Sequence, residues 1–364
     1  ALNQMREKQR ENGEKIRYDG TWRPEPGKTL PAPPAGISPV IRFKNPQTGV
    51  VQWNDLVKGP ISISNEELDD LVLARQDGSP TYNFCVVVDD WEMEITHVIR
   101  GDDHINNTPR QMNILAALGA TLPEYGHIPM ILGPDGEKLS KRHGAVSVVQ
   151  YHEEGFLPDA MVNYLARLGW SHGDHEYFSR EQFVQWFDGS NLSRSAAQFD
   201  PEKLKWLNAQ YMKQADPVDL LGDLTHRLNK IGINPHQPSN PALAEVLNVV
   251  LERASTLVEL RDEAALFYRE PTGFEAELHT MLDAETREAL QAFCARLPHI
   301  EWSATELSGL IKETIKAHGL KMPRLAMPLR LLLTGQKQTP SIDKVMALLG
   351  PETVQRRVAH GLAL

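Results

Sequence analysis

The sequence predicts an α/β region followed by an all-α region. The short apolar run at 84–88 has the length and composition of a strand that is buried on both faces of a parallel sheet, and 95–99 and 127–132 are two further strand candidates. From residue 157 onward, apolar residues recur with helical spacing and are bounded by helix-capping sequences. The switch from strand-like runs to helical spacing therefore divides the chain into two kinds of structure.

The first 75 residues are predicted to form a small mixed unit. A charged helix runs from residue 1 to residue 13, and a proline-rich loop follows it. Two strands, at 40–43 and 50–53, flank a turn sequence and are expected to form a hairpin. The first helix starts at Ala1 without a capping residue, so we expect the chain to be a fragment of a longer polypeptide.

Residues 76–150 are predicted to hold half of a parallel α/β sheet. After the first two strands, a helix starts with Thr108 as its N-cap and ends at Gly119. No glycine-rich phosphate turn and no first βαβ unit precede the first strand. Because ligands bind beyond the carboxyl ends of parallel strands, we expect a site at that edge.

The remaining residues are predicted to be helical in two parts, 151–216 and 217–364. The boundary is placed at the break before Pro217. The helices expected after this break span 242–268, 284–297, 304–318 and 323–333, followed by two short helices near Ser341 and Glu352.

The composition is that of a globular protein, because 41% of the 364 residues are hydrophobic and 24% are charged. The formal net charge is -10, so contact with a nucleic acid requires a local basic surface. Cys85 and Cys294 are far apart and suit a reducing cytosol, so a cytoplasmic location is expected. No apolar run reaches about 18 residues, and we expect no membrane contact.

A basic loop at 138–142 is the most informative motif of the chain. It places two lysines, an arginine and the hydroxyl of Ser140 within five residues, between turn sequences. Such a loop can hold a polyphosphate and neutralise the charge that develops on it during a reaction. The alternative is an ordinary solvated basic turn.

Tyr82 and Arg100 suggest a site for a small acid near this loop. Arg100 closes the second predicted strand, and Tyr82 opens the first. A guanidinium can bind a carboxylate with two hydrogen bonds, and a phenol can donate another. The alternative is that Arg100 forms a structural ion pair with Asp102 or Asp103. A metal site at 102–104 is not expected, because adjacent residues seldom converge on one ion.

Four segments of the chain match a known family. They are residues 78–90, 95–111, 138–142 and 195–204. In them the chain resembles bacterial glutamyl-tRNA synthetases, which are class I aminoacyl-tRNA synthetases, and the resemblance extends over essentially the whole sequence. The resemblance implies the C-terminal half of a Rossmann-like catalytic domain. It also implies a tRNA acceptor-binding insertion, a stem-contact helical domain and a helical anticodon-binding domain.

In sequence order, the resemblance places the remainder of the acceptor-binding insertion at 1–75 and the catalytic domain at 76–150. It places the stem-contact domain at 151–216 and the anticodon-binding domain at 217–364.

The resemblance also implies a role for each residue of the predicted site. Tyr82 and Arg100 are expected to bind the glutamate substrate, with Arg100 on a carboxylate. Asp103 and His104 are expected to line the adenosine pocket. The loop residues expected to bind the triphosphate of ATP are Lys138, Ser140, Lys141 and Arg142, and Lys138 and Lys141 are expected to be catalytic.

The implied reaction is ATP-dependent ligation of L-glutamate to tRNA(Glu) through a glutamyl-adenylate, by a monomeric enzyme. Magnesium is expected to bridge phosphate oxygens of ATP. Some relatives carry a zinc knuckle in the acceptor-binding insertion, but residues 18–24 contain no cysteine or histidine, so zinc is not expected. The histidine-containing signature loop of the family is absent, and we therefore expect this chain to be an inactive fragment.

Several basic side chains in the late helices are candidates for contact with tRNA. They are Lys312, Lys316, Lys321, Arg324 and Arg330, together with Arg356 and Arg357. The alternative for each is a solvated helical face. The residues that read the anticodon are not assigned by the sequence.

Three other functions remain open. A glutaminyl-tRNA synthetase would carry β-barrels after Asp216, where helical spacing is seen. The short paralogue that glutamylates a modified tRNA base would lack an anticodon-binding module. A non-catalytic tRNA-binding remnant fits the missing signature, but the intact loop at 138–142 opposes it. Whether tRNA(Gln) is also charged is left open.

Overall fold

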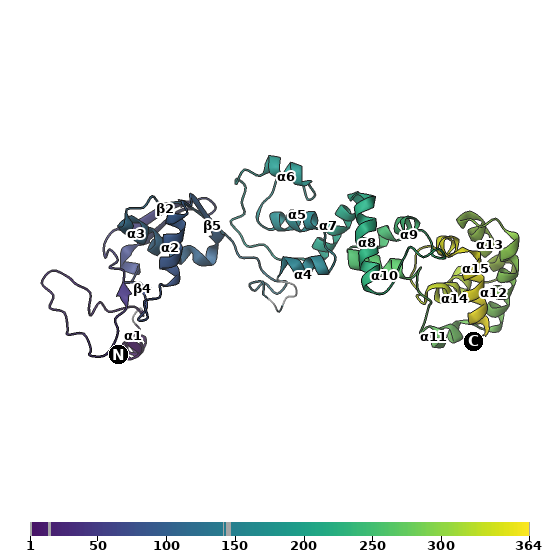
Figure 1. Cartoon of the computed structure of the whole chain (residues 1–364), viewed down its shortest axis with the longest axis horizontal. Helices are drawn as coiled ribbons and strands as arrows, with labels where there is room; N and C mark the ends of the chain where they lie inside the picture. Colours follow the sequence, from purple (N-terminus) through teal and green to yellow (C-terminus); the bar gives the residue numbers. More distant parts are fainter. Residues whose placement is uncertain (1, 14–15, 141, 143–146, 364) are drawn as a thin grey trace. The chain divides into compact units, whose positions relative to one another are not determined.

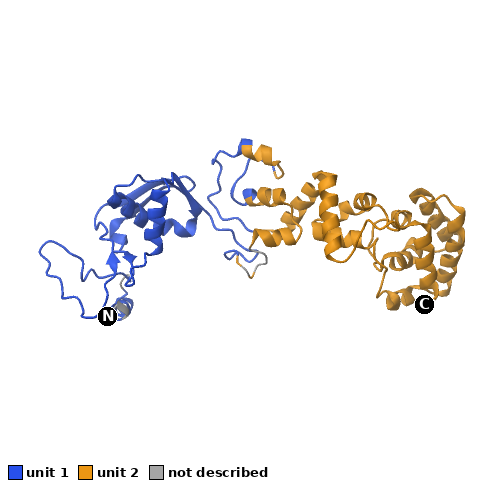
Figure 2. Cartoon of the chain, viewed as in Figure 1, with its two compact units in different colours: residues 1–139, 166–175, 185–199 blue, residues 140–165, 176–184, 200–364 orange. Residues whose placement is uncertain are grey.

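The computed structural model describes residues 2–13, 16–140, 142 and 147–363. The chain divides into two compact units (Figure 2). Unit 1 comprises residues 1–139, 166–175 and 185–199, and unit 2 comprises residues 140–165, 176–184 and 200–364. Each unit has buried apolar clusters of its own.

Unit 1 combines short strands with helices (Figure 1). Its elements up to residue 128 are α1 (Leu2–Glu11), β1 (Ile41–Arg42), β2 (Val50–Asp55), β3 (Gly59–Ser64), η1 (Asn65–Glu67), β4 (Val72–Ala74), α2 (Tyr82–Glu92), β5 (His97–Gly101), η2 (Asp102–Asn107), α3 (Thr108–Leu118) and β6 (Glu124–Ile128). Within the described residues the strands pair as β1 with β4, β2 with β3, and β5 with β6.

The hairpin predicted from 40–43 and 50–53 is wrong. The hairpin is formed by β2 and β3 instead, with Asp55 opposite Gly59 at its turn. The Asp55 side chain accepts a hydrogen bond from the backbone N–H of Lys58, which closes this turn. An aspartate-based turn one strand later therefore sets the pairing, and β1 is left to pair with β4.

The strand predicted at 84–88 is also wrong, because these residues belong to helix α2. Phe84 and Val87, three residues apart, pack with Ile114 and Leu115 of α3 in one cluster. A short apolar run does not distinguish a buried strand from a helix, and here the contact with α3 decides. Tyr82 therefore opens a helix and not a strand.

The parallel pairing expected in this region is confirmed. β5 and β6 run parallel, with Arg100 opposite His127. β6 ends at Ile128, so the strand expected at 127–132 lies earlier in the sequence than predicted. The helix between the strands is confirmed, and it ends at Gly119, whose φ of 74° is the left-handed conformation that favours glycine.

Helices form the named elements from residue 147 to residue 363 (Figure 1). They are α4 (Val148–Glu153), α5 (Pro158–Gly169), α6 (Arg180–Trp186), α7 (Pro201–Gln214), α8 (Pro217–Lys230), α9 (Leu243–Val250), η4 (Leu251–Arg253), α10 (Leu257–Ala265), α11 (Glu275–Met281), α12 (Ala284–Arg296), η5 (Leu297–His299), α13 (Ala304–Ala317), α14 (Met322–Thr334) and α15 (Ile342–Ala363). The predicted order of an α/β region followed by an all-α region is confirmed, while the domain boundaries stay predictions.

The continuous helix expected at 242–268 is wrong, because the chain breaks between η4 and α10. The Thr256 hydroxyl accepts from the N–H of Glu259, and the Glu259 carboxylate accepts from the N–H of Ser255. These two bonds form a capping arrangement that starts α10 afresh. The two short helices expected near Ser341 and Glu352 meet at a kink at Gly350, within α15.

Asn208 fixes the start of the helical bundle in unit 2. Its buried side chain accepts from the N–H of Leu157 at 2.8 Å and donates to the carbonyl of Ser255 at 2.6 Å. Gly155 lies against α10 so closely that a Cβ there would fall 2.6 Å from the backbone nitrogen of Val258. A glycine and one buried amide thus join α7, α10 and the end of α4.

No helix among the described residues is both long enough and apolar enough to cross a membrane.

Candidate functional site

Arg100 lies half-buried in β5, and neutral side chains hold it. Its Nη2 donates to the Thr108 hydroxyl at 2.9 Å and to the Gln111 amide oxygen at 2.7 Å. Its Nε donates to Nε2 of His127 at 3.4 Å. Burial lowers the pKa of this guanidinium, but an arginine remains a cation in proteins. The side chain is therefore oriented without being neutralised.

The alternative prediction, an ion pair of Arg100 with Asp102 or Asp103, is wrong. Asp102 pairs instead with Lys58 at 2.9 Å, and Asp103 pairs with Lys138 at 3.2 Å. Within the part of the chain that the structure describes, no carboxylate forms a salt bridge with Arg100. A half-buried cation with neutral partners keeps its charge for a ligand, so Arg100 can bind a carboxylate.

A buried chain of hydrogen bonds links β2 to Arg100. The Asp55 carboxylate accepts from Nδ1 of His127 and, at 3.0 Å, from the His127 backbone N–H. Nε2 of His127 lies 3.0 Å from the Thr108 hydroxyl, which in turn accepts from Arg100. The bonds are all satisfied when the imidazole proton is on Nδ1 and Nε2 accepts from Thr108. His127 therefore couples the position of Asp55 to that of Arg100.

Asp55 is ionised, and it is the acceptor at one end of this series of hydrogen bonds. Burial alone would raise the pKa of its carboxyl group. Hydrogen bonds from the backbone N–H of Lys58, from the side chain and backbone of His127, and from the backbone of Val57 lower it to about 2. The buried charge is stabilised by these donors, and Asp55 is therefore a carboxylate at neutral pH.

The other expected site residues of unit 1 lie near Arg100. The rings of Tyr82 and His104 are 5.9 Å apart, and Tyr82 is 52% exposed at the start of α2. Both Tyr82 and Asp103 are close enough to act on the pKa of Arg100. The hydrogen bond from Lys138 lowers the pKa of Asp103. The structure thus brings together a phenol, an imidazole, an exposed ion pair and a guanidinium.

Gly101 is the point at which the chain turns from β5 into η2. A Cβ at this position would lie 2.7 Å from Oδ1 of Asp103 and 3.0 Å from the sulfur of Met130. A side chain at this position would therefore require the Asp103 carboxylate to shift. The Asp103 carboxylate lies close to the end of the strand, where it accepts a hydrogen bond from Lys138.

The basic loop is described only in part. Lys138 forms a bridge with Leu132, and the N–H of Leu139 donates to the carbonyl of Ile131 at 2.9 Å, so the loop begins on a short turn. Ser140 and Arg142 are assigned to unit 2, whereas Lys138 is assigned to unit 1. Lys141 lies outside the described residues.

Four residues that support Arg100 were not identified from the sequence as site residues: Asp55, Thr108, Gln111 and His127. Thr108 was expected to be the N-cap of a helix, but the N-cap is Asn107 and Thr108 is the first helical residue. Its hydroxyl serves Arg100 and His127 instead. A polar residue at the start of a helix can be its N-cap or can bind a side chain elsewhere, and the sequence looks the same in both cases. The sequence therefore offers no signal that separates the two roles.

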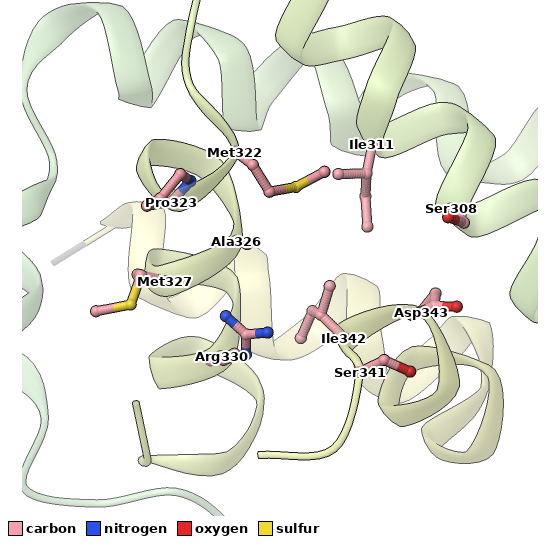
Figure 3. Close-up of a pocket in the computed structure, with 10 residues that line it drawn as sticks. All are labelled: Ser308, Ile311, Met322, Pro323, Ala326, Met327, Arg330, Ser341, Ile342 and Asp343. Carbon is pink, nitrogen blue, oxygen red and sulfur yellow. The ribbon is translucent and has the colours of Figure 1, made fainter. Parts of the chain in front are cut away.

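A hollow lies between α13, α14 and α15, and Figure 3 shows the side chains around it. Its volume is about 280 Å³. Its lining residues are Ser308, Ile311, Met322, Pro323, Ala326, Met327, Arg330, Ser341, Ile342 and Asp343. Arg330 is held by a hydrogen bond from its Nε to the Thr339 hydroxyl at 3.2 Å. Apolar walls with one oriented cation suit a flat ring that carries hydrogen-bond acceptors.

The late basic residues differ in their partners. Arg324 pairs with Asp283 and Glu285, and Arg356 pairs with Glu270. These two arginines therefore contribute little net positive charge to the surface.

Arg357 is buried, and one of its bonds is to the carbonyl of Leu333, which is a structural use. Lys312, Lys316 and Lys321 form no salt bridge with any described residue. The basic surface of these helices is therefore smaller than the sequence indicates.

Among the described residues, no group of three or more histidine, cysteine, aspartate or glutamate side chains is arranged to hold a metal ion.

Two family models together match nearly the whole chain. The model described as tRNA synthetases class I (E and Q), catalytic domain, matches residues 1–206, and the model described as an anticodon binding domain matches residues 206–362. The structure agrees with this result. Arg100 lies on a parallel strand pair, near a phenol and an ion pair, and a helical bundle follows in the sequence. The chain belongs to the class I tRNA synthetases (E and Q).

Two of its relatives in this family, and one solved structure, are glutamate–tRNA ligases. The glutamate–tRNA ligase of Thiobacillus denitrificans is 60% identical over 361 residues, which cover 99% of this chain and 76% of the relative. The glutamate–tRNA ligase of Janthinobacterium sp. is 61% identical over 358 residues, which cover 98% and 77%. A crystal structure of a glutamate tRNA ligase from Elizabethkingia meningosepticum, in complex with its amino acid, is similar with a TM-score of 0.82 and 28% identity. That match covers 100% of this chain and 77% of the solved one.

Two of the alternatives do not agree with these findings. A glutaminyl enzyme with β-barrels after Asp216 does not fit the helices that form the elements of that region. The short paralogue without an anticodon-binding module does not fit the match at 206–362.

Proposed function

We propose that this protein ligates L-glutamate to tRNA(Glu) with ATP, through a glutamyl-adenylate. The single observation that carries the proposal is Arg100, a half-buried cation that neutral side chains orient and no described carboxylate neutralises. Such a group binds an acidic substrate strongly, because the substrate supplies the missing negative charge. The names of the relatives supply the class of acid and the acceptor.

In the proposed mechanism, Arg100 binds one carboxylate of glutamate and the Tyr82 hydroxyl donates a hydrogen bond to the same substrate. The reacting carboxylate oxygen attacks the α-phosphorus of ATP, a new O–P bond forms, and the bond to pyrophosphate breaks. A hydroxyl of the terminal ribose of tRNA then attacks the acyl carbon and AMP leaves. Positioning and charge neutralisation drive both steps, and no covalent bond to the enzyme is needed.

We infer that the nucleotide binds next to the ion pair of Asp103 and Lys138. Lys138 is exposed and its partner is exposed, so a triphosphate can replace Asp103 as the partner of the ammonium group at little cost. Asp103 and His104 would then face the adenosine. Magnesium would enter with the triphosphate, because it prefers phosphate oxygens and retains several waters.

The rest of the basic loop would act on the same phosphates. Ser140, Lys141 and Arg142 follow Lys138 directly, and their charges and hydroxyl suit the pyrophosphate that leaves. Lys138 and Lys141 are the proposed catalytic residues, because their charge would stabilise the transition state.

We also propose that the hollow between α13, α14 and α15 accepts an unstacked base of the anticodon. It lies within the residues that match an anticodon binding domain, and it combines apolar walls with the oriented Arg330. Single-stranded bases can be recognised by stacking and by hydrogen bonds to their edges, which these side chains can supply.

Further properties follow from the same proposal. We propose that the enzyme is monomeric and works in the cytoplasm, where the free thiols of Cys85 and Cys294 stay reduced. Charging of tRNA(Glu) alone, or also of tRNA(Gln), can be measured with the two tRNAs side by side.

The test is an assay of the full-length gene product. We expect glutamate-dependent exchange between ATP and pyrophosphate in the presence of tRNA(Glu), followed by transfer of glutamate to that tRNA. Tight binding of tRNA without any transfer of glutamate would instead support the non-catalytic remnant. Exchange that depends equally on glutamine would refute the assignment of the substrate.

A further inference from the structure

Residues 131–139 form a short hairpin that carries Lys138, and we call it the Lys138 hairpin. Lys138 lies opposite Leu132 in its pairing, and the N–H of Leu139 donates to the carbonyl of Ile131 at 2.9 Å. The hairpin belongs to unit 1. Its position decides where the first cation of the basic loop lies.

A segment distant in the sequence, residues 194–199, pairs with the Lys138 hairpin. The N–H of Leu132 donates to the carbonyl of Ala197 at 2.9 Å, and the N–H of Phe199 donates to the carbonyl of Leu132 at 2.8 Å. Leu132 and Gln198 are therefore partners in a parallel bridge, and both lie in unit 1. The hairpin is thus held by a neighbouring stretch of chain as well as by its own pairing.

Gln198 adds a side-chain hydrogen bond to this backbone pairing. Its Nε2 donates to the carbonyl of Pro134 at 2.6 Å. The turn of the hairpin uses the carbonyl of Gly133, which accepts from the N–H of Gly136 at 3.0 Å, so the Pro134 carbonyl is open to another donor. Both backbone bonds converge on Leu132, and alone they would allow the hairpin to rotate about that residue. The bond from Gln198 lies closer to the turn and restricts this rotation.

The start of the same segment is bound to the residue next to Asp103. The Lys58 ammonium group donates to the carbonyl of Arg194 at 3.0 Å and to the Asp102 carboxylate at 2.9 Å. Asp103 itself accepts from Lys138 at 3.2 Å. The segment therefore connects the backbone on both sides of the ion pair that Asp103 and Lys138 form.

We propose that Gln198 is a positioning residue that sets the place of Lys138 during formation of the adenylate. This inference rests on the proposed function, in which a triphosphate replaces Asp103 as the partner of Lys138. The hairpin then loses its salt bridge to Asp103. Its bonds to residues 194–199 do not use the Lys138 side chain, so they persist when ATP binds. A charge stabilises a transition state only when it is held at the right place, and Gln198 holds it there.

The test measures exchange between ATP and pyrophosphate by variants of the full-length protein, with tRNA(Glu) present. Gln198→Met keeps the length of the side chain and removes the donor, and Gln198→Glu replaces the donor by an acceptor. We expect kcat to fall about two- to tenfold in both, which is the effect of losing one neutral hydrogen bond. The KM for glutamate should not change, because the described partners of Arg100 do not include this hairpin. The urea midpoint should not change either, since Gln198 is exposed.

Gln150→Met is the matched control. The Gln150 amide also donates one exposed hydrogen bond, to Glu154 at 3.2 Å. The kcat of this variant should equal that of the unmodified protein. A fall in kcat as large as that of Gln198→Met would overturn the inference, because the loss would then not depend on the Lys138 hairpin.

Two further measurements distinguish positioning of Lys138 from a general effect on the fold. Gln198→Met should reduce kcat less in a Lys138→Ala background than in the unmodified protein, because the two residues act together. In hydrogen exchange followed by mass spectrometry, peptides that cover 131–139 should exchange faster in Gln198→Met, whereas peptides that cover β6 should not change. Equal reductions of kcat in the two backgrounds, or unchanged exchange at 131–139, would contradict the proposed role.

The outcomes also separate this inference from the proposed function. If the unmodified protein catalyses glutamate-dependent exchange and Gln198→Met does so with the same kcat, the role of Gln198 is excluded and the proposed function stands. If the unmodified protein shows no exchange with tRNA(Glu) present, both are excluded.

Discussion

The Asp55 carboxylate and the His127 imidazole form a buried pair where β2 meets β6. Both side chains are almost fully inaccessible, and the backbone N–H of His127 adds a second bond to the same carboxylate. Through Thr108, this pair reaches Arg100, which we propose binds the substrate. A residue of the hairpin, 45 positions before Arg100 in the sequence, therefore helps to set the geometry of the site.

The change Asp55→Asn should destabilise the protein and weaken substrate binding together. An amide can satisfy fewer of the donors around it, and the loss of a buried charged acceptor costs about 2–4 kcal/mol of unfolding free energy. Urea denaturation at neutral pH measures this loss. The KM for glutamate should rise in the same variant because Arg100 loses its support. Asp103→Asn is the control, and its urea midpoint should be unchanged since that carboxylate is exposed.

The stability of the protein should depend on pH through Asp55. The pKa of its carboxyl group is about 2 in the fold against an ordinary 3.8, so the ionised form stabilises the folded state. This contribution, about 2 kcal/mol, is complete above the ordinary value and is lost as the pH falls from about 4 towards about 2. The difference in unfolding free energy between the unmodified protein and Asp55→Asn should shrink over that range. A difference that stays constant down to about pH 2 would contradict the assignment.

The change Arg100→Ala should weaken the binding of glutamate by about 2–4 kcal/mol, because it removes a charge-assisted contact in a half-buried site. The KM for glutamate in the exchange assay reports this loss. Arg100→Lys keeps the charge but not the planar fork that contacts Thr108, Gln111 and His127, so it should recover only part of the affinity. An unchanged KM in Arg100→Ala would refute the proposed contact.

The change Arg330→Ala should lower kcat/KM for tRNA(Glu) by about tenfold, because one bidentate contact to a base is worth roughly 1–3 kcal/mol. The loss should be smaller on transcripts whose anticodon is already altered, since the contact is absent there. Arg296→Ala is the matched control, because this exposed arginine of α12 is paired with Glu313. A uniform loss on all transcripts would indicate contact with the RNA backbone instead.

The change Gly361→Ala should destabilise the helical bundle by about 1–3 kcal/mol. A Cβ at this position would clash with Cδ2 of Leu332, and that buried side chain has to move from its packed position. Gly222→Ala is the control, because a Cβ on α8 meets open space and an alanine favours the helix by about 0.5–1 kcal/mol. Thermal unfolding of the two variants, monitored side by side, should move in opposite directions.

Much of the fold could be predicted from the sequence. Helices with clear period and caps, such as those at 284–297 and 304–318, lie almost as expected, because local spacing and capping determine them. The run at 84–88 failed because apolar residues alone do not select between strand and helix. The prediction of the hairpin was wrong because its turn depends on hydrogen bonds to the Asp55 side chain, and these bonds are not evident from the types of residue in the turn.

The sequence predicted the residues proposed to contact the substrates. It did not predict the residues that hold Arg100 in place, which are Asp55, Thr108, Gln111 and His127. Tyr82, Arg100, Asp103, His104 and Lys138 were expected to act together, and the structure brings them together in unit 1. Their roles stay predictions.

The sequence by itself determined the kind of protein, since motif residues close together in the chain carry the chemistry of its family. Only the tertiary structure decided that Arg100 has no carboxylate partner among the described residues and that Asp55 and His127 support it. The reason is physical. A local motif specifies which groups are present, whereas the charge left on each one depends on neighbours that folding brings from distant positions.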